Sequence, residues 1–434
     1  MVAFSSKLAT GGDGKRQMSI TAQADVIVVG AGPSGSATAY HAARAGLRVT
    51  LLDRQEFPRD KACGDGLLPH AASEIRRMGL DEWLSNPQHG RFEGYAIYSK
   101  TATVRERDGE PGYIIPRKET DAALLGQARA AGADFHEGVK AESLLYNPGG
   151  EVTGVHAVAN GEPLSFHAPL VVAADGIGRF AADGIKGSQN GIALRQYFSG
   201  VQVTQRDMAH FWFTEDMSRY GIGYGWVFFF GDGEANVGVG LLDNAARRSP
   251  YKLKQLHYRF LEEPSVKELL EGSSPQEEPK SWSLKMGTRG NKKHGQGLMV
   301  VGEAAGLTYP LSGEGVGFSL ESGRIAAKWA EIATSRNDYS SEMLAGYAQE
   351  HGAMRGRHFL SGQYVAEFGD RYPRLDVLEN LLSACQNDPG ARETLSRVFY
   401  GDSPVYEMVA HPKMLGRAAY GSVRNLRVRR GERL

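Results

Sequence analysis

A strand, a glycine-rich turn and a helix near the N-terminus constrain the fold of this chain more than any other feature. Residues 26–29 form a continuous β-branched run, which is typical of a strand buried on both faces. Residues 30–35 read Gly-Ala-Gly-Pro-Ser-Gly and match the pattern G-x-G-x-x-G. Small residues at 37–45 then predict a helix, and residues 47–52 predict a second strand. This βαβ unit is typical of a Rossmann-like domain that binds a dinucleotide.

The glycines of the turn each have a physical reason. Gly30 permits the tight turn, Gly32 lets the backbone approach a pyrophosphate, and Gly35 allows the helix to pack closely on the strand. The free N–H groups at the start of the helix attract phosphate. Asp53 closes the second strand, where a carboxylate accepts a ribose hydroxyl. The alternative is a glycine-rich turn that binds no ligand.

The composition excludes some other classes of protein. The 434 residues contain 50 Lys and Arg against 50 Asp and Glu, and this balance argues against a nucleic-acid binder. The two cysteines, Cys63 and Cys385, cannot form a disulfide framework, which favours a reducing compartment. No apolar run is long enough to span a membrane, and residues 1–24 lack the apolar core of a signal peptide. We therefore expect a cytoplasmic protein.

The rest of the chain predicts a nucleotide-binding domain that is interrupted by a second sheet. Alternating residues in 92–116 and 192–240 indicate antiparallel strands, whereas 170–174 and 298–301 read as buried strands. We predict an α/β chain, α+β overall, in which a Rossmann-like domain is interrupted by an antiparallel-sheet substrate domain and followed by a helical C-terminal region. The predicted segments are a mobile tail (1–22), the nucleotide-binding domain (23–90, 114–185 and 288–335), the substrate domain (91–113 and 186–287) and the helical region (336–434).

Two later motifs extend the first one. Asp175 and Gly176 close the buried strand 170–174, and residues 302–315 read Gly-Glu-Ala-Ala-Gly-Leu-Thr-Tyr-Pro-Leu-Ser-Gly-Glu-Gly. With the first turn they resemble the three FAD fingerprints of the flavoprotein hydroxylase fold (para-hydroxybenzoate hydroxylase type), except that its third motif usually has Gly-Asp where this chain has Gly302-Glu303. The resemblance implies FAD as cofactor, bound by Gly30, Gly32, Ser34, Gly35, Asp53, Arg54, Arg117, Asp175, Gly176, Glu303, Gly313 and Gly315.

Within that fold, residues 24–335 resemble the geranylgeranyl reductase family. Residues 57–67, Phe-Pro-Arg-Asp-Lys-Ala-Cys-Gly-Asp-Gly-Leu, are similar to its F-P-R-x-K-x-C-G-x-G segment. Residues 224–229, Tyr-Gly-Trp-Val-Phe-Phe, are similar to its Y-x-W-x-F-P motif, with Phe229 in place of proline. Residues 236–240 also read like the family. The resemblance implies FAD-dependent saturation of carbon–carbon double bonds in a polyprenyl lipid or quinone tail.

The same resemblance suggests which side chains act in the reaction. It places Cys63 near the flavin ring, where the thiol either donates a proton or only packs. Asp65 either relays a proton or binds a loop N–H, and Tyr224 is a third candidate for the proton donor. Alternate residues of one strand either bind the prenyl chain or belong to an ordinary core: Trp226, Phe228 and Phe230. We expect no metal site, because the histidines show no metal-binding spacing.

Electron donor and membrane contact are further expectations. No second G-x-G-x-x-G follows a buried strand, so we expect electrons from transiently docked NAD(P)H or from a protein donor of reductase or ferredoxin type. Residues 424–434 hold five Arg and one Glu, which makes them either a solvated tail or a peripheral contact with anionic lipid. The alternative functions are an FAD monooxygenase or halogenase-like enzyme acting on an aromatic or specialised metabolite, and an escort protein for prenyl groups. A halogenase is expected to show W-x-W-x-I-P, and here Trp226 stands alone.

Overall fold

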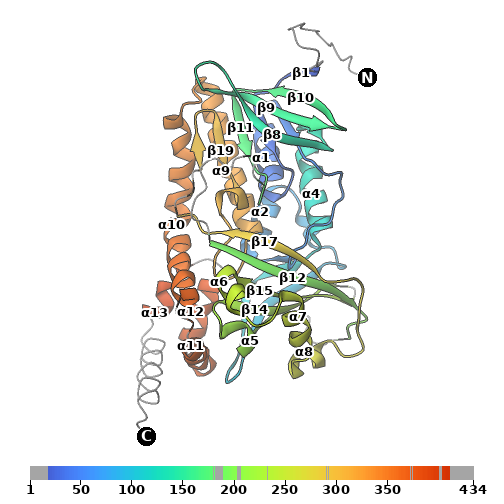
Figure 1. Ribbon diagram of the computed structural model, residues 1–434, viewed down its shortest axis with the longest axis vertical. Helices are drawn as coiled ribbons and strands as arrows, with labels where there is room; N and C mark the ends of the chain where they lie inside the picture. Colours follow the sequence, from blue (N-terminus) through green and yellow to red (C-terminus); the bar gives the residue numbers. More distant parts are fainter. Residues whose placement is uncertain are drawn as a thin grey trace.

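The computed structural model describes most of the chain. The described residues are 18–178, 180, 189–202, 207–231, 233–289, 291, 293–371, 373, 375–399 and 403–410. Their strands form three sheets, one of which is mostly parallel. Figure 1 shows the parallel sheet and its helices in the upper half of the molecule and the largest sheet in the lower half.

The six-stranded sheet is built from the strands that the sequence predicts to be buried. Its order is β18-β19-β11-β2-β3-β7. Its four central strands pair in parallel: β2 (Val26–Val29), β3 (Val49–Leu52), β11 (Leu170–Ala173) and β19 (Leu298–Val300). The edge strand next to β3 is parallel as well. Every residue of β2, β3 and β11 is buried, because helices cover one face of this sheet and a smaller sheet packs against the other. β7 (Asp134–His136) and β18 (His294–Gly295) form its edges.

Small side chains hold the helices close to this sheet. α1 (Pro33–Arg44) packs against α9 (Val316–Arg336) and α4 (Arg117–Ala130). The core between them is rich in alanine, including Ala39, Ala42 and Ala330. A Cβ on Gly323 of α9 would lie 2.3 Å from the Ser34 carbonyl oxygen. The glycine therefore permits a close approach of two helix backbones, and this places the N-termini of both helices at one end of the sheet.

The largest sheet forms the other half of the molecule. Its order is β16-β12-β15-β14-β13-β5-β6-β4, and β17 pairs with β12. The main strands are β5 (Gly90–Ser99), β6 (Thr103–Ile114), β12 (Gln189–Ser199), β13 (Met208–Phe213), β14 (Gly223–Phe229), β15 (Glu234–Leu242) and β17 (Lys280–Met286), with the short strands β4 (Gly66–Leu67) and β16 (Ser274–Pro275) at the edges. The pair β5–β13 is parallel, unlike the antiparallel arrangement that the alternation predicts. The chain passes through the other half of the molecule between these two strands.

A third sheet corrects one boundary of the sequence analysis. Its order is β1-β10-β9-β8, with β1 (Met18–Gln23), β10 (Glu162–His167), β9 (Val152–Ala159) and β8 (Val139–Tyr146). The sequence predicts a mobile tail over residues 1–22, but residues 18–23 form β1, which pairs in parallel with β10. The backbone groups on the outer edge of β10 explain this, because an edge strand can take up a further strand. Residues 1–17 lie outside the described residues.

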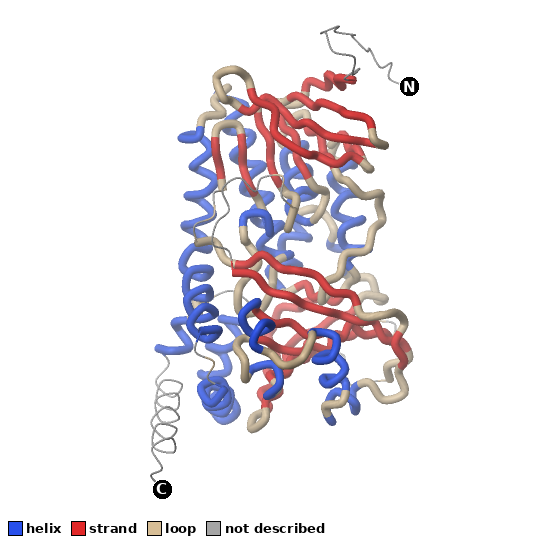
Figure 2. The backbone as a smooth tube through the Cα atoms, viewed as in Figure 1, coloured by secondary structure: helices blue, strands red, loops and turns tan. Residues whose placement is uncertain are grey.

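Helices complete the fold at its C-terminal end. They are α10 (Ser341–Arg371), α11 (Leu375–Asn387), α12 (Pro389–Phe399) and α13 (Tyr406–Ala410). α10 runs along one side of both halves, and α11 and α12 lie beside the largest sheet (Figures 1 and 2). Glu379 of α11 accepts hydrogen bonds from the backbone N–H groups of Lys100 and Thr101, which fixes this helix to the β5–β6 hairpin. The basic segment 424–434 lies outside the described residues.

Shorter helices connect these parts. They are α2 (Pro69–Arg77), α3 (Asp81–Leu84), α5 (Glu215–Ser218), α6 (Asp243–Arg248), α7 (Leu253–Leu261), α8 (Pro264–Leu269) and the 3-10 helix Gly302–Ala305. Among the described residues, no helix is long and apolar enough to cross a membrane.

Candidate functional site

The glycine turn has the tight geometry that its sequence predicts. Gly30 has φ +101°, and a Cβ there would lie 2.4 Å from the Ala174 carbonyl oxygen. A Cβ on Gly35 would lie 1.7 Å from the Gly30 carbonyl oxygen. These two positions need glycine for the fold itself. Ser34, in the first turn of α1, is buried, and its Oγ lies 2.5 Å from the position of a Cβ on Gly302.

Gly32 is different, because the fold alone does not require glycine there. It is the N-cap of α1, with φ −73° and ψ −173°, a conformation that any residue adopts. A Cβ on Gly32 would meet only the Arg59 side chain, at 3.7 Å from Nη2. The space in front of Gly32 is therefore a cradle at a helix N-terminus with a guanidinium beside it, which is suited to a pyrophosphate.

The acidic residue after β3 buttresses this turn. Asp53 is buried, and its Oδ2 accepts a hydrogen bond of 2.8 Å from the Ala31 N–H. Its Oδ1 accepts one of 2.9 Å from the Gln55 N–H. Each carboxylate oxygen keeps a second lone pair, so the side chain can still accept a ribose hydroxyl. Burial raises the pKa of Asp175, and the positive charge of the exposed Arg54 side chain opposes this only weakly.

The second and third motifs meet beside the glycine turn. Asp175 accepts a hydrogen bond from the Phe180 N–H, and its other oxygen is buried without a hydrogen-bond partner among the described residues. Glu303 Oε2 lies 3.6 Å from the position of a Cβ on Gly176. Lys61 forms an ion pair with Glu303 over 3.3 Å. The longer Glu303 side chain thus reaches the second motif.

The N-terminus of α9 borders the same region. Gly315 is its N-cap, and Gly313 has φ +69°. Glu314 Oε1 accepts a hydrogen bond of 2.7 Å from the Gly317 N–H, while burial raises the pKa of this carboxyl. Behind it, a buried Glu321 pairs with His70 over 2.7 Å and with Arg355 over 2.9 Å. This ionic cluster fixes α9 to α2 and α10.

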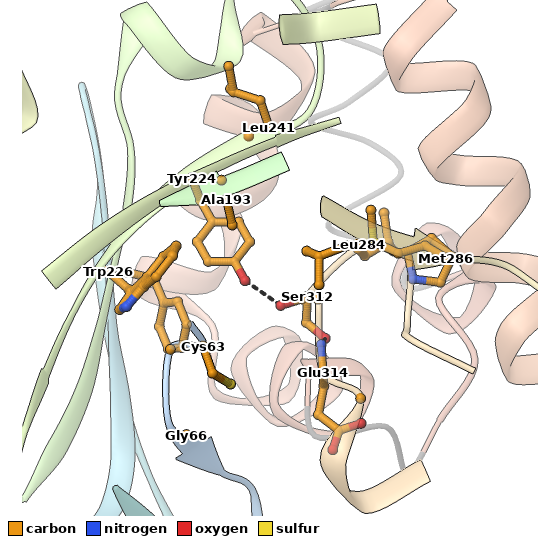
Figure 3. A pocket seen from close by; sticks show the side chains of 18 of the residues that line it. Cys63, Gly66, Ala193, Tyr224, Trp226, Leu241, Leu284, Met286, Ser312 and Glu314 are labelled. Carbon is orange, nitrogen blue, oxygen red and sulfur yellow. Dashed lines mark hydrogen bonds between the residues drawn. The ribbon is translucent and has the colours of Figure 1, made fainter. Parts of the chain in front are cut away.

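A pocket lies between this helix end and the largest sheet. Its polar lining is small and includes Cys63, Asp65, Tyr224, Ser312 and Glu314. Most of its wall is apolar and comes from side chains far apart in the sequence: Leu68, Ile192, Phe211, Ile222, Trp226, Phe228, Leu241, Leu242, Trp282, Leu284, Met286, Leu311 and Phe399. The third motif thus forms one side of a cavity whose other walls are aliphatic and aromatic (Figure 3).

The loop that carries Cys63 is held by Asp65 and Asn236. Asp65 has φ +61°, and its Oδ1 accepts a hydrogen bond from the Arg117 N–H. Its Oδ2 accepts bonds of 2.6 Å from the Tyr197 hydroxyl and 2.7 Å from the Asn236 amide. Asn236 also donates to the Cys63 carbonyl and accepts from the Trp226 indole N–H. Asp65 therefore caps the first N–H of α4 and ties the Cys63 loop to β12 and β15.

Burial changes the acidity of both groups in this loop. It raises the pKa of the Cys63 thiol, against the opposing positive charge of Arg117. It also raises the pKa of Asp65 to about 6, against the hydrogen bonds from Tyr197 and Asn236. The Cys63 thiol is therefore protonated near neutral pH. The pKa of Asp65 lies closer to neutral pH than that of an ordinary aspartate.

The glycines on either side of Asp65 are needed for a close contact that the sequence alone does not show. A Cβ on Gly64 would lie 3.4 Å from the Trp226 Nε1 atom, and a Cβ on Gly66 would lie 3.4 Å from the Phe228 ring. The loop therefore rests on the aromatic side chains of β14. This contact brings the predicted cysteine and the predicted aromatic strand into one site.

Arg117 is buried in an ionic cluster. Its guanidinium donates two hydrogen bonds, of 2.7 and 2.8 Å, to Asp121. Arg59 also pairs with Asp121, over 2.9 Å. Two guanidinium groups thus share one buried carboxylate, which leaves a net positive charge between the Gly32 cradle and Cys63. Such a charge favours an anionic ligand.

The remaining predicted residues lie on β14 or, for Phe230, directly after it. The Tyr224 hydroxyl donates a hydrogen bond to the Ser312 carbonyl, so this side chain joins the sheet to the third motif (Figure 3). Trp226 and Phe228 line the pocket, whereas Phe230 packs against Tyr197 in the same core cluster and does not line the pocket. Val227 and Phe229 belong to the core on the other face, as strand alternation predicts.

Comparisons with known proteins agree with this geometry. Residues 23–354 match the family model described as an FAD binding domain. A menaquinone reductase from Mycolicibacterium smegmatis is 35% identical over 333 residues, which cover 74% of this chain and 79% of the relative. A digeranylgeranylglycerophospholipid reductase from Methanosarcina acetivorans is 32% identical over 340 residues, which cover 74% of this chain and 78% of the relative. The chain belongs to the geranylgeranyl reductase family of FAD-dependent oxidoreductases.

Solved structures share the fold of this geranylgeranyl reductase family member. A geranylgeranyl bacteriochlorophyll reductase-like protein from Thermoplasma acidophilum has a TM-score of 0.77 at 25% identity, and the match covers 92% of this chain and 99% of that one. A flavin-dependent brominase has a TM-score of 0.74 at 19% identity, and the match covers 87% and 94% of the two chains. The brominase, at this identity, shows the fold alone.

The residues of the site fit FAD. The open cradle at Gly32, the positive charge of Arg59 and the buried oxygen of Asp175 are each suited to a part of a dinucleotide. Three residues of this site were missed in the sequence: Arg59, Asn236 and Phe399. Arg59 and Asn236 lie inside segments quoted for the resemblance, and a polar residue in an apolar strand was a signal for Asn236. Nothing in the sequence near Phe399 indicated a place in the pocket.

Proposed function

We propose that the protein is an FAD-dependent reductase that saturates carbon–carbon double bonds of a polyprenyl lipid or quinone tail. The observation that carries this proposal is the composition of the pocket: an apolar wall with a cysteine-bearing loop on one side and the third FAD motif on the other. A prenyl chain has no hydrogen-bonding groups, so aliphatic and aromatic walls are its natural partners. The names of the similar reductases support the same substrate class.

The predicted cofactor residues would hold FAD along one path. We propose the α1 N-terminus at Gly32, together with Arg59, for the pyrophosphate, and Asp53 for the adenosine ribose. Asp175 and Glu303 are suited to hydroxyl groups of the linker, and the N-terminus of α9 at Gly315 is suited to negative charge. Arg117 contributes positive charge from behind the Cys63 loop. Reduced FAD, when bound, supplies a hydride.

The chain's own residues would exclude water and provide the proton. Trp226 and Phe228 cover one wall, and we propose that Phe230 supports them rather than contacting the substrate. Cys63 lines the pocket with a thiol that burial keeps protonated, which suits a donor to an alkene carbon. Asp65, from the same loop, would take up a proton from solvent and pass it to the thiolate after each turnover, which its raised pKa favours. Tyr224 would position the third motif through its bond to Ser312.

The electron donor and the location of the protein belong to the same proposal. Electrons would come from NAD(P)H that docks transiently or from a reductase or ferredoxin-type protein. We also propose a cytoplasmic protein with peripheral contact to the membrane in which prenyl lipids reside.

Mass spectrometry of lipid extracts from cells with and without the gene tests the proposed reaction. A gain of two hydrogens per step in a prenyl lipid or quinone, present only with the gene, is the expected result. A matched control is the Gly32→Val variant expressed at the same level, which is expected to lose the product together with the flavin. A mass shift of one oxygen would instead identify a monooxygenase, and unchanged prenyl masses would refute the reductase.

A further inference from the structure

The second half of α10 carries a concentration of exposed apolar side chains. Of the large apolar residues that are exposed in the described part of the chain, five lie within residues 354–368. Their exposed fractions are 50% for Met354, 40% for Leu360, 57% for Tyr364, 37% for Val365 and 64% for Phe368. Single exposed apolar residues are ordinary, but a group on one helix marks an interaction surface.

Helical geometry places these residues on one side of α10. Successive residues turn by about 100°, so Leu360, Tyr364 and Phe368, four apart, form one stripe. Arg357 and Arg371, each seven residues from Tyr364, extend the same stripe, and both are exposed. We call the surface formed by Met354, Arg357, Leu360, Tyr364, Val365, Phe368 and Arg371 the α10 outer face.

The opposite side of the helix packs on the wall of the pocket. Ala366 is buried in a cluster with Leu242 and Met286, which both line the pocket. A Cβ on Gly369 would lie 3.0 Å from Ile222, another lining residue. One helix thickness therefore separates the α10 outer face from the apolar cavity. Figure 1 shows this helix on the outside of the molecule, beside the largest sheet.

The charges around this face are mainly positive. Arg357 and Arg371 belong to it, and Arg289 lies over the Tyr364 ring, 5.3 Å from its centroid. The carboxylate of Glu367 is paired with Arg289 over 2.7 Å. Aromatic and aliphatic side chains with interspersed arginines are typical of helices that lie in the interface of an anionic membrane.

We infer that the α10 outer face is a docking surface for an anionic lipid bilayer. Its apolar side chains enter the interface, and its arginines lie at the level of the lipid phosphates. The further step, that docking brings membrane-resident prenyl groups to the pocket, rests on the proposed function. The docking itself does not, because it depends only on the exposed side chains and their charge.

Vesicle sedimentation of the full-length, FAD-loaded protein tests the docking. The probes are vesicles of phosphatidylcholine, alone and mixed with phosphatidylglycerol. The double variant Tyr364→Gln/Phe368→Gln is expected to lower partitioning onto the mixed vesicles at least ~10-fold, because two aromatic side chains no longer leave water. Arg357→Gln is expected to lower it roughly 5-fold at low salt and less at high salt. Tyr146→Gln, at a residue 60% exposed on β8, is the matched control and should change nothing.

Other occupants of this face would give other results. Wild-type partitioning that Tyr364→Gln/Phe368→Gln leaves unchanged would overturn the proposal, and so would a wild-type protein that binds neither vesicle. A change from dimer to monomer in the double variant, seen by analytical ultracentrifugation without lipid, would identify an interface between copies and also overturn it. Reduction of a detergent-dispersed prenyl substrate is measured in parallel. If the double variant loses vesicle binding but still reduces the dispersed substrate, the docking surface is supported. If the wild-type protein binds vesicles but reduces no prenyl substrate, only the proposed function is refuted.

Discussion

Replacement of Gly32 by valine separates the cofactor site from the fold. In the structure, Gly32 adopts ordinary extended angles, and a Cβ there meets only Arg59 Nη2 at 3.7 Å. The apoprotein should therefore tolerate the substitution, at a cost of about 1 kcal/mol for a poorer N-cap. The valine methyl groups would, however, occupy the space in front of the first N–H groups of α1.

The expected loss of FAD affinity follows from those N–H groups. Pro33 has none, which leaves the N–H groups of Gly32, Ser34 and Gly35 at the helix start. A hydrogen bond to a charged group contributes about 1.5–3 kcal/mol, so the loss of two costs roughly 3–6 kcal/mol. The dissociation constant of FAD is therefore expected to rise between ~10²-fold and ~10⁴-fold.

The measurement combines a flavin titration with an unfolding curve. Apoprotein is titrated with FAD and followed by flavin fluorescence, and its urea unfolding is followed by circular dichroism. Gly126→Val is the matched control, because a Cβ at Gly126 meets nothing within 4 Å and the residue lies on α4. An unchanged FAD dissociation constant in a stable Gly32→Val protein would refute the assignment of the cradle. Equal losses of stability and affinity would show that Gly32 serves the fold.

Three further predictions concern the ionisable side chains of Cys63, Asp65 and Glu321. Cys63→Ala should leave FAD bound and reducible but slow the single-turnover oxidation of reduced enzyme by substrate at least ~10²-fold. Cys63→Ser should give an intermediate rate, because serine keeps a proton but is the weaker acid. A wild-type rate in Cys63→Ala would show that Cys63 only packs in the pocket. Burial raises the pKa of Asp65 to about 6, above its value in the unfolded chain. The unfolding free energy should therefore fall as pH rises through about 6, and Asp65→Asn should flatten this limb in urea titrations. Although burial opposes it, the bond from His70 and the charge of Arg355 lower the pKa of Glu321 to about 2. Stability should then be lost as pH falls from about 4.5 towards 2, by up to ~3 kcal/mol, and Glu321→Gln should lose this dependence; an unaltered acid limb would contradict the pairing.

Local patterns predicted much of the fold. The run 26–29, the glycine turn and the alternation in 92–116 were predictable, because the conformation of each is determined by residues close together in the sequence. The helix after the turn begins at Pro33 rather than at residue 37, because proline is well suited to the first helical position. The cofactor motifs were equally accessible, since each is a short segment with its own geometry.

Contacts between distant segments were not accessible. The bond from Asn236 to Asp65 and the place of Phe399 in the pocket join parts of the chain that no local pattern relates. The same holds for the two arginines that share Asp121, because an ion pair between residues 59 and 121 depends on the tertiary fold. The reason for Gly64 also lies elsewhere, in the indole of Trp226.

The parallel pairing of β5 with β13 has a consequence for how the molecule folds. Its partners, such as Gly94 and Met208, lie roughly 100 residues apart in the chain, and the intervening segment contains β11 and α4 of the other half. β5 and β13 can pair only after the long segment between them has brought its two ends together. The folding of the two halves is therefore interdependent. A protease cut within residues 115–188 would therefore leave two fragments that must reassociate, and neither half should refold alone as a cooperative unit.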